Sequence, residues 1–196
     1  MVTTNIPVEK HPLEPFLPEG TNILMLGSFP PERKRWSMEF FYPNWGNDMW
    51  RIWGLIFFGD KQYFEITADK RFDHERIASF CTEHGIALYD TACEVRRLRD
   101  NASDKFLEVV RPTDIKALLD ALPHCQAIIT TGEKATDTLV EQFACSKPKV
   151  GEYVEIHHNS RTLHFWRMPS SSRAYPLSLE RKAERYECML REERIK

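Results

Sequence analysis

Several signatures of common protein classes are missing from this sequence of 196 residues. No stretch reaches the ~18 consecutive apolar residues of a membrane span, so we expect no membrane partner. The five cysteines form no CxxC pair, which argues against a zinc ribbon or an iron–sulfur cluster and favours reduced thiols. Residues 1–20 lack the basic-then-apolar pattern of a secretory signal. Together these absences predict a cytoplasmic protein.

Sequence motifs for cofactors and hydrolytic nucleophiles are absent as well. The chain has no GxGxxG or GxxxxGK[ST] loop for phosphate and no GxSxG serine elbow. Its seven histidines show no HExxH spacing. His157 and His158 are adjacent, so in a strand they would point to opposite faces. We therefore expect neither a metal nor a cofactor.

The charge is nearly balanced, with a net value of −2. A protein that coats nucleic acid nonspecifically is usually basic overall, so the net charge does not predict that role. Positive charge is nevertheless clustered at 31–36 (PERKRW), 94–100 (EVRRLRD) and 179–186 (LERKAERY). Solvated faces with interspersed acids would explain each cluster taken alone.

Apolar strand patterns alternate with helical patterns along the chain. This alternation predicts one α/β domain over residues 1–196, a sandwich with a mostly parallel sheet that follows an extended lead-in at 1–20. The polar segment 145–160 is expected to form a hairpin or a loop. The expected strands are 22–27, 86–90, 126–132 and 161–168, and the expected helices are 48–58, 73–85, 113–123, 133–144 and about 177 to the end, with Ser178 as its cap.

Two loops of unusual composition follow the first and last of these strands, at 27–36 (GSFPPERKRW) and 169–176 (PSSSRAYP). Ligands bind at the carboxyl ends of parallel strands, so we expect both loops to line one cleft. Glycine at a strand end allows the backbone to approach a ligand closely. Serines and an arginine can hold a phosphate. Aromatic faces at 41–45 could stack on a base, so the pattern is typical of a nucleotide site.

Each of these features also has a purely structural explanation. The aromatic residues at 40–57 could belong to the core, Asn47 could cap a helix, and the serines could form a turn. The functional interpretation depends on their occurrence together.

In chain order, several motifs resemble the uracil-DNA glycosylase superfamily and most closely its hypoxanthine-DNA glycosylase branch. The resemblance covers roughly residues 11–190. The matching segments are His11-Pro12, LMLGSFP at 24–30, FYPNWGNDMW at 41–50, HGIALYD at 84–90, the pair Ser103-Asp104, and PSSSRA at 169–174.

This resemblance implies a three-layer α/β/α sandwich around a four-stranded, mostly parallel sheet. It implies a monofunctional enzyme that hydrolyses the N-glycosidic bond of a deaminated base in DNA, without a metal or a lyase lysine. Asn47 maps onto the catalytic asparagine of the branch, and Asn44 is a rival because the loop before Asn47 departs from the family pattern. Met168 stands where the best-known uracil enzymes have a histidine.

We therefore expect DNA with a damaged or mismatched base as the partner, and no obligate protein partner. Asn47 is expected to orient the attacking water. The expected base-binding residues are Gly27, Ser28, Phe29 and Tyr42, and the expected DNA-binding residues are Ser170, Ser171, Ser172 and Arg173. Two alternatives remain: a DNA- or nucleotide-binding protein of the same fold with impaired catalysis, and a hydrolase of free nucleosides or nucleotides.

Overall fold

The central sheet has five strands in a computed structural model that describes residues 6–99 and 104–195. Neighbouring strands are parallel from β5 through β2 and β8 to β10, and β9 pairs antiparallel with β10 at the edge. The prediction of a four-stranded, mostly parallel sheet is therefore wrong, because the sheet has five strands of mixed orientation. In spatial order the strands are β5 (Ile86–Asp90), β2 (Ile23–Gly27), β8 (Ala127–Thr131), β10 (Arg161–Met168) and β9 (Glu152–His158).

The additional strand arises from the polar segment at 145–160, for which the sequence predicted a hairpin or a loop. It is the first strand of a hairpin with β10, in which Arg161 pairs with His158. Of the seven residues of β9, only Ile156 and His158 are buried. Such an edge strand lacks a continuous apolar run, so its composition alone does not reveal it.

Three strands of the central sheet, β2, β5 and β8, are buried along their whole length. Every residue of β2, β5 and β8 is buried, because helices cover both faces of a parallel sheet. This burial explains why short continuous apolar runs such as Ile23–Leu26 mark these strands in the sequence.

Five α-helices with recognisable end signals accompany the sheet. Asp73, Asp114 and Ser178 each accept a hydrogen bond from a main-chain N–H in the first turn of α2, α3 and α5. The helix α1 ends at Gly59, whose φ of 66° gives a left-handed C-terminal residue. The helices are α1 (Met49–Phe58), α2 (His74–Glu83), α3 (Ile115–Asp120), α4 (Glu133–Phe143) and α5 (Leu179–Glu192), with short 3-10 turns at Arg33–Arg35, Thr67–Asp69 and Asp104–Phe106.

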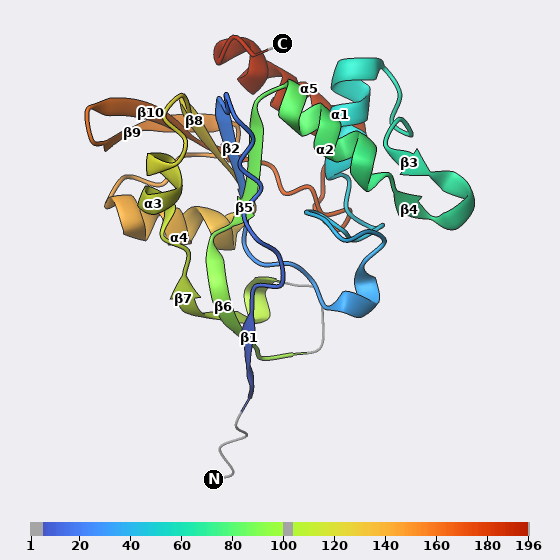
Figure 1. Cartoon of the computed structure of the whole chain (residues 1–196), viewed down its shortest axis with the longest axis horizontal. Helices are drawn as coiled ribbons and strands as arrows, with labels where there is room; N and C mark the ends of the chain where they lie inside the picture. Colours follow the sequence, from blue (N-terminus) through green and yellow to red (C-terminus); the bar gives the residue numbers. More distant parts are fainter. Residues whose placement is uncertain (1–5, 100–103, 196) are drawn as a thin grey trace.

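The helices form two groups with the central sheet between them. Figure 1 shows α1, α2 and α5 together on one side, and α3 and α4 on the other. The α1 helix is buried from Met49 to Gly54, because Trp50 and Trp53 pack into the core that the sheet shares with α5. None of the helices in the described ranges has the length and apolar character needed to cross a membrane.

Two smaller sheets extend the structure beyond the pattern that the sequence predicted. The lead-in forms β1 (Val8–Lys10), which pairs with β6 (Ala92–Arg97), and β6 pairs with β7 (Leu107–Pro112). A two-stranded sheet joins β3 (Glu65–Ile66) to β4 (Arg71–Phe72). The β1–β6 pairing places the lead-in beside the end of β5, where Nε2 of His11 lies 2.9 Å from Oδ2 of Asp90.

Candidate active site

A cavity of about 770 Å³ lies at the carboxyl ends of β2, β5, β8 and β10. Ligands of open α/β sheets generally bind at the carboxyl ends of the strands, and the cavity has this position. The loop after β2 and the loop after β10 both line it, as the sequence analysis expected. The lining includes Gly27–Pro31, Phe41–Asn44, Gly46, Asn47, Asp90, Arg97, Asp104, Lys105, Thr131–Glu133, Arg167, Met168, Ser170–Ser172, Ala174 and Tyr175.

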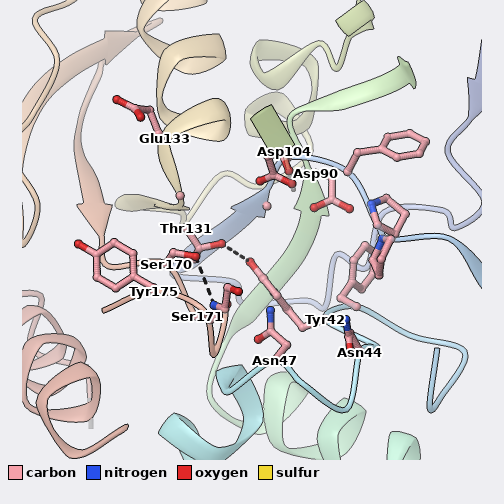
Figure 2. Close-up of a pocket in the computed structure, with 18 of the residues that line it drawn as sticks. Tyr42, Asn44, Asn47, Asp90, Asp104, Thr131, Glu133, Ser170, Ser171 and Tyr175 are labelled. Carbon is pink, nitrogen blue, oxygen red and sulfur yellow. Dashed lines mark hydrogen bonds between the residues drawn. The ribbon is translucent and has the colours of Figure 1, made fainter. Parts of the chain in front are cut away.

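Asn47 lines this cavity immediately before α1. Its Oδ1 accepts a hydrogen bond from the N–H of Met49 at 2.9 Å, so the carboxamide oxygen stabilises the start of the helix. The side-chain nitrogen then points toward the pocket (Figure 2). The N-cap of α1 is Asp48, which makes no side-chain capping bond, and Asn47 bonds the first N–H of the helix from one residue earlier. The group that Asn47 offers to a ligand is therefore an N–H donor.

Asn44, the rival position, also lines the cavity. Its Oδ1 accepts a hydrogen bond from the N–H of Gly46 at 2.8 Å, which shapes the loop before Asn47. In both asparagines the side-chain oxygen therefore accepts a hydrogen bond from a main-chain N–H.

Tyr42 has a strained backbone at the wall of the cavity. Its φ is 52°, which is uncommon for an aromatic residue and is found where the surrounding structure imposes it. The hydroxyl lies 3.2 Å from Oγ1 of Thr131, and the ring meets Trp50 edge-on. Burial, with a contribution from the Asp90 carboxylate, raises the pKa of Tyr42 well above its ordinary value. Its hydroxyl therefore stays protonated at neutral pH.

Phe29 lines the cavity but is only 8% exposed. Its ring packs in a small apolar cluster with Ala92, Val95 and Leu107, and it meets the His11 ring edge-on at 5.3 Å between centroids. Much of its surface is therefore already covered by the β6–β7 sheet.

The serine loop after β10 is fixed by its own hydrogen bonds. The N–H of Ser172 donates to Oγ of Ser170 at 3.2 Å, and the N–H of Ala174 donates to Oγ of Ser172 at 3.3 Å. Ser171 is buried, whereas Ser172 and Arg173 are exposed. The structure therefore brings all three serines to the cavity and also gives two of them the turn-forming role.

Arg173 is the predicted site residue that does not line the cavity. Its Nε lies 3.3 Å from Oδ1 of Asp48, and its side chain is 55% exposed at the surface beside the serine loop. It can therefore meet a phosphate only outside the pocket.

A buried charge cluster connects the serine loop with the start of α1. Lys182 on α5 is fully buried, and its Nζ donates to Oδ2 of Asp48 at 3.1 Å and to the main-chain oxygen of Ser172 at 2.8 Å. Arg51 lies 3.7 Å from the Asp48 carboxylate and pairs with Glu65 at 2.5 Å. In the sequence the LERKAERY segment is only a basic cluster, because helix position alone does not reveal which of its three basic side chains is buried.

Three carboxylates line the cavity, Asp90, Asp104 and Glu133, and sequence reasoning assigned a role to none of them. Asp90 is the last residue of β5, so the rule that sites form at strand ends could have identified it. Asp104 entered the sequence analysis only through the resemblance, as part of the pair with Ser103, and Ser103 lies outside the described residues. In the parts of the chain that the structure describes, no group of three or more His, Cys, Asp or Glu side chains is arranged to hold a metal ion.

Burial raises the pKa of the Asp104 carboxyl above its ordinary value of 3.8. The hydroxyl of Ser28 donates a hydrogen bond to this carboxyl and opposes the shift, whereas the charge of Asp90 adds to it. Lys134 and Arg97 also oppose the shift through their positive charges. The pocket therefore holds a carboxyl group, Asp104, that burial makes harder to ionise.

Fold and cavity together define an α/β protein with a polar pocket at the ends of parallel strands. No protein-family model and no curated protein matches the chain, whereas sixteen chains of solved structures do. One of them is the solution NMR structure of a "putative Uracil DNA glycosylase" from Methanosarcina acetivorans. It matches with a TM-score of 0.64 and 23% sequence identity over 96% of this chain and 99% of that chain. This similarity shows a uracil-DNA glycosylase-like fold, and it does not distinguish the hypoxanthine-DNA glycosylase branch.

Proposed function

We propose that this protein is a monofunctional DNA glycosylase that hydrolyses the N-glycosidic bond of a deaminated base, which is uracil, hypoxanthine or xanthine, after that base is flipped out of DNA. The observation that carries the proposal is the cavity of about 770 Å³ in which an aromatic ring, an amide donor and the carboxyl groups of Asp90 and Asp104 converge beside a serine loop. The volume lies within the range of roughly 300–1,000 Å³ that is typical of small-molecule sites. The similarity to the archaeal protein supports the same fold.

An enzyme that cleaves a base from a duplex must extrude the nucleotide, at a cost of a few kcal/mol that is lower for a mispaired base. In the proposed complex the base occupies the cavity against Gly27, Ser28, Phe29 and Tyr42. Tyr42 has the more accessible ring for stacking, because Phe29 is covered by the β6–β7 sheet. Stacking on such a ring contributes about 1–3 kcal/mol per base.

Asn47 is the proposed catalytic residue. Since its oxygen is bonded to the N–H of Met49, we assign the side-chain N–H groups to the reacting nucleotide, where they would stabilise charge that develops on the leaving base. This assignment replaces the expected role of orienting the attacking water. Asn44 remains the rival for the same role.

DNA phosphates would lie along the serine loop and the positively charged rim. Ser170, Ser172 and Arg173 are accessible there, whereas buried Ser171 would contribute through the shape of the loop. Arg97, Lys105 and Arg167 also line the cavity, where Arg97 is paired with Glu9 and Arg167 with Glu133. A protein with a net charge of −2 can bind DNA through such a local surface.

A substrate panel tests the proposal. Duplexes that contain uracil, hypoxanthine or xanthine opposite each normal base are incubated with the wild type and with Asn47→Ala, and the released base is quantified by liquid chromatography. The wild type should release at least one of these bases, and Asn47→Ala should not. Unmodified duplex and free deoxynucleosides are the controls; release from free deoxynucleosides would instead indicate a nucleoside hydrolase.

The second candidate is a DNA- or nucleotide-binding protein that has lost catalysis. Met168 favours it, because this residue is 1% exposed and offers no proton to a leaving base. Duplex binding without release of any base in the panel would select this candidate.

A further inference from the structure

Neither the end of β2 nor Asn47 offers an acceptor for a proton of the attacking water. Strand β2 ends in Gly27, followed by Ser28 and Phe29, none of which carries a carboxylate. The side-chain oxygen of Asn47 already accepts from the N–H of Met49. A carboxylate from a neighbouring strand could supply the acceptor, and Asp90 ends the adjacent parallel strand β5, paired in register with Gly27.

The absence of a side chain at Gly27 creates the space for the Asp90 carboxylate. A Cβ at position 27 would lie only 2.4 Å from Oδ1 of Asp90 and would displace it. Figure 2 shows the Asp90 carboxylate directed into the pocket that also contains Tyr42 and Asn47. The glycine therefore has a second function besides close approach of a ligand, because it lets a carboxylate from the next strand cover the end of β2.

His11 fixes the orientation of this carboxylate. Its Nε2 donates to Oδ2 of Asp90 at 2.9 Å, and its Nδ1 lies 2.8 Å from the main-chain oxygen of Leu13. The ring is held between Tyr89, at 4.6 Å between centroids, and Phe29, and its side chain is 2% exposed. With Oδ2 bonded in this way, Oδ1 accepts no hydrogen bond from the residues that the structure describes and remains available to the pocket.

We propose that Asp90 is a catalytic residue, whose Oδ1 accepts the proton of the attacking water and stabilises positive charge on the sugar, and that His11 is its positioning residue. This inference rests on the proposed glycosylase function. Asn47 and Asp90 then divide the reaction, since the amide donates toward the base and the carboxylate faces the sugar.

The reaction balances with these two groups. The C1′–N bond breaks, and its electron pair leaves with the base, which takes a proton from solvent. The oxygen of the water bonds to C1′, and one water proton passes to Oδ1 of Asp90. Release of that proton to solvent restores the enzyme, and the products are the free base and an abasic sugar with a hydroxyl at C1′.

Binding of abasic-site analogues tests the charge of the site independently of turnover. One duplex carries a neutral tetrahydrofuran and the other a cationic pyrrolidine, which mimics the positive sugar. The wild type should bind the pyrrolidine duplex about tenfold more tightly, because an ion pair with Asp90 of roughly 1.4 kcal/mol forms only there. Asp90→Asn should lose this preference and keep its affinity for the tetrahydrofuran duplex, which also shows that it is folded.

Single-turnover release on the substrate found in the panel completes the test. Asp90→Asn should reduce the release rate by about 100-fold, as expected for loss of a general base. Asp69→Asn is the matched control, since Asp69 is a carboxylate with 57% of its side chain exposed and does not line the cavity, and it should leave both the preference and the rate unchanged.

The outcomes separate this inference from the proposed function. If the wild type releases a base and Asp90→Asn does so at the same rate, the role of Asp90 is overturned and the glycosylase proposal stands. Equal affinity of the wild type for the two abasic duplexes would also overturn the role of Asp90. If the wild type neither binds duplex nor releases any base, the proposed function itself fails, and this inference fails with it.

Discussion

The main chains of Asn47 and Ser172 form an antiparallel β-bridge, which joins the start of α1 to the loop after β10. Next to this bridge, the N–H of Asp48 donates to the main-chain oxygen of Ser171 at 2.8 Å. Lys182 bonds both sides, at Asp48 and at Ser172. The asparagine and the serine loop are thus held in one fixed arrangement, although they lie far apart in the sequence.

This arrangement predicts that Lys182→Met destabilises the protein. The substitution leaves the buried Asp48 carboxylate without its lysine, and we expect a loss of about 3 kcal/mol in the free energy of unfolding, measured by urea denaturation at neutral pH. The double variant Lys182→Met/Asp48→Asn should recover part of the loss, because it removes a buried charge that has lost its lysine and keeps only Arg51 and Arg173 beside it. A single variant as stable as the wild type would show that the cluster contributes nothing to stability.

Asn47→Asp separates the two roles of the asparagine. The aspartate keeps an oxygen that can accept from the N–H of Met49, so the thermal stability should match the wild type. It lacks the N–H donors, and base release should therefore fall by about 100-fold in single-turnover assays. Asn47→Ala should in addition lose about 1 kcal/mol of stability with the hydrogen bond from Met49.

Asn44→Asp is the matched control, since Asn44 has the same kind of local bond to Gly46 and also lines the cavity. If Asn47→Asp released the base at the wild-type rate and Asn44→Asp released it more slowly, the catalytic role would belong to Asn44.

The environment of Asp104 predicts a pH dependence of stability. Burial raises its pKa in the folded state, so the folded protein holds this proton more tightly than the unfolded chain. The stabilisation is complete below the ordinary pKa of 3.8 and is lost as the pH rises through the raised value. Asp104→Asn should consequently be more stable than the wild type at pH 8, with a difference that shrinks toward pH 4.

Urea denaturation of both proteins across this pH range measures the effect. The asparagine can still accept the hydrogen bond from Ser28, so the comparison isolates the charge. A difference that grows toward acid pH would contradict the assignment.

If Arg173 contacts a DNA phosphate, it contributes to the salt dependence of duplex binding. Each phosphate contact contributes about 0.9 to the slope of log affinity against log salt concentration, so Arg173→Ala should reduce that slope by about 1. Fluorescence anisotropy at several salt concentrations provides the measurement. Arg191→Ala, at an exposed position near the C-terminal end of α5, should leave the slope unchanged. An equal reduction in both variants would indicate general charge effects without a specific phosphate contact.

The sequence by itself determined the strands β2, β5, β8 and β10, the helices between them and the position of the pocket at the strand ends. Strands that are buried on both faces must be apolar throughout, and helices need caps such as Ser178, so both leave local signals. The same locality identified Gly27 and the serine loop, which directly follow apolar strands.

Only the tertiary structure decided which groups meet inside the pocket. His11 and Asp90 are 79 positions apart, and Lys182 reaches Asp48 across 134 positions, so no local pattern links them. Edge strand β9 and the β1–β6–β7 sheet are likewise defined by their partners, because pairing and one-sided burial depend on what the rest of the chain places beside them.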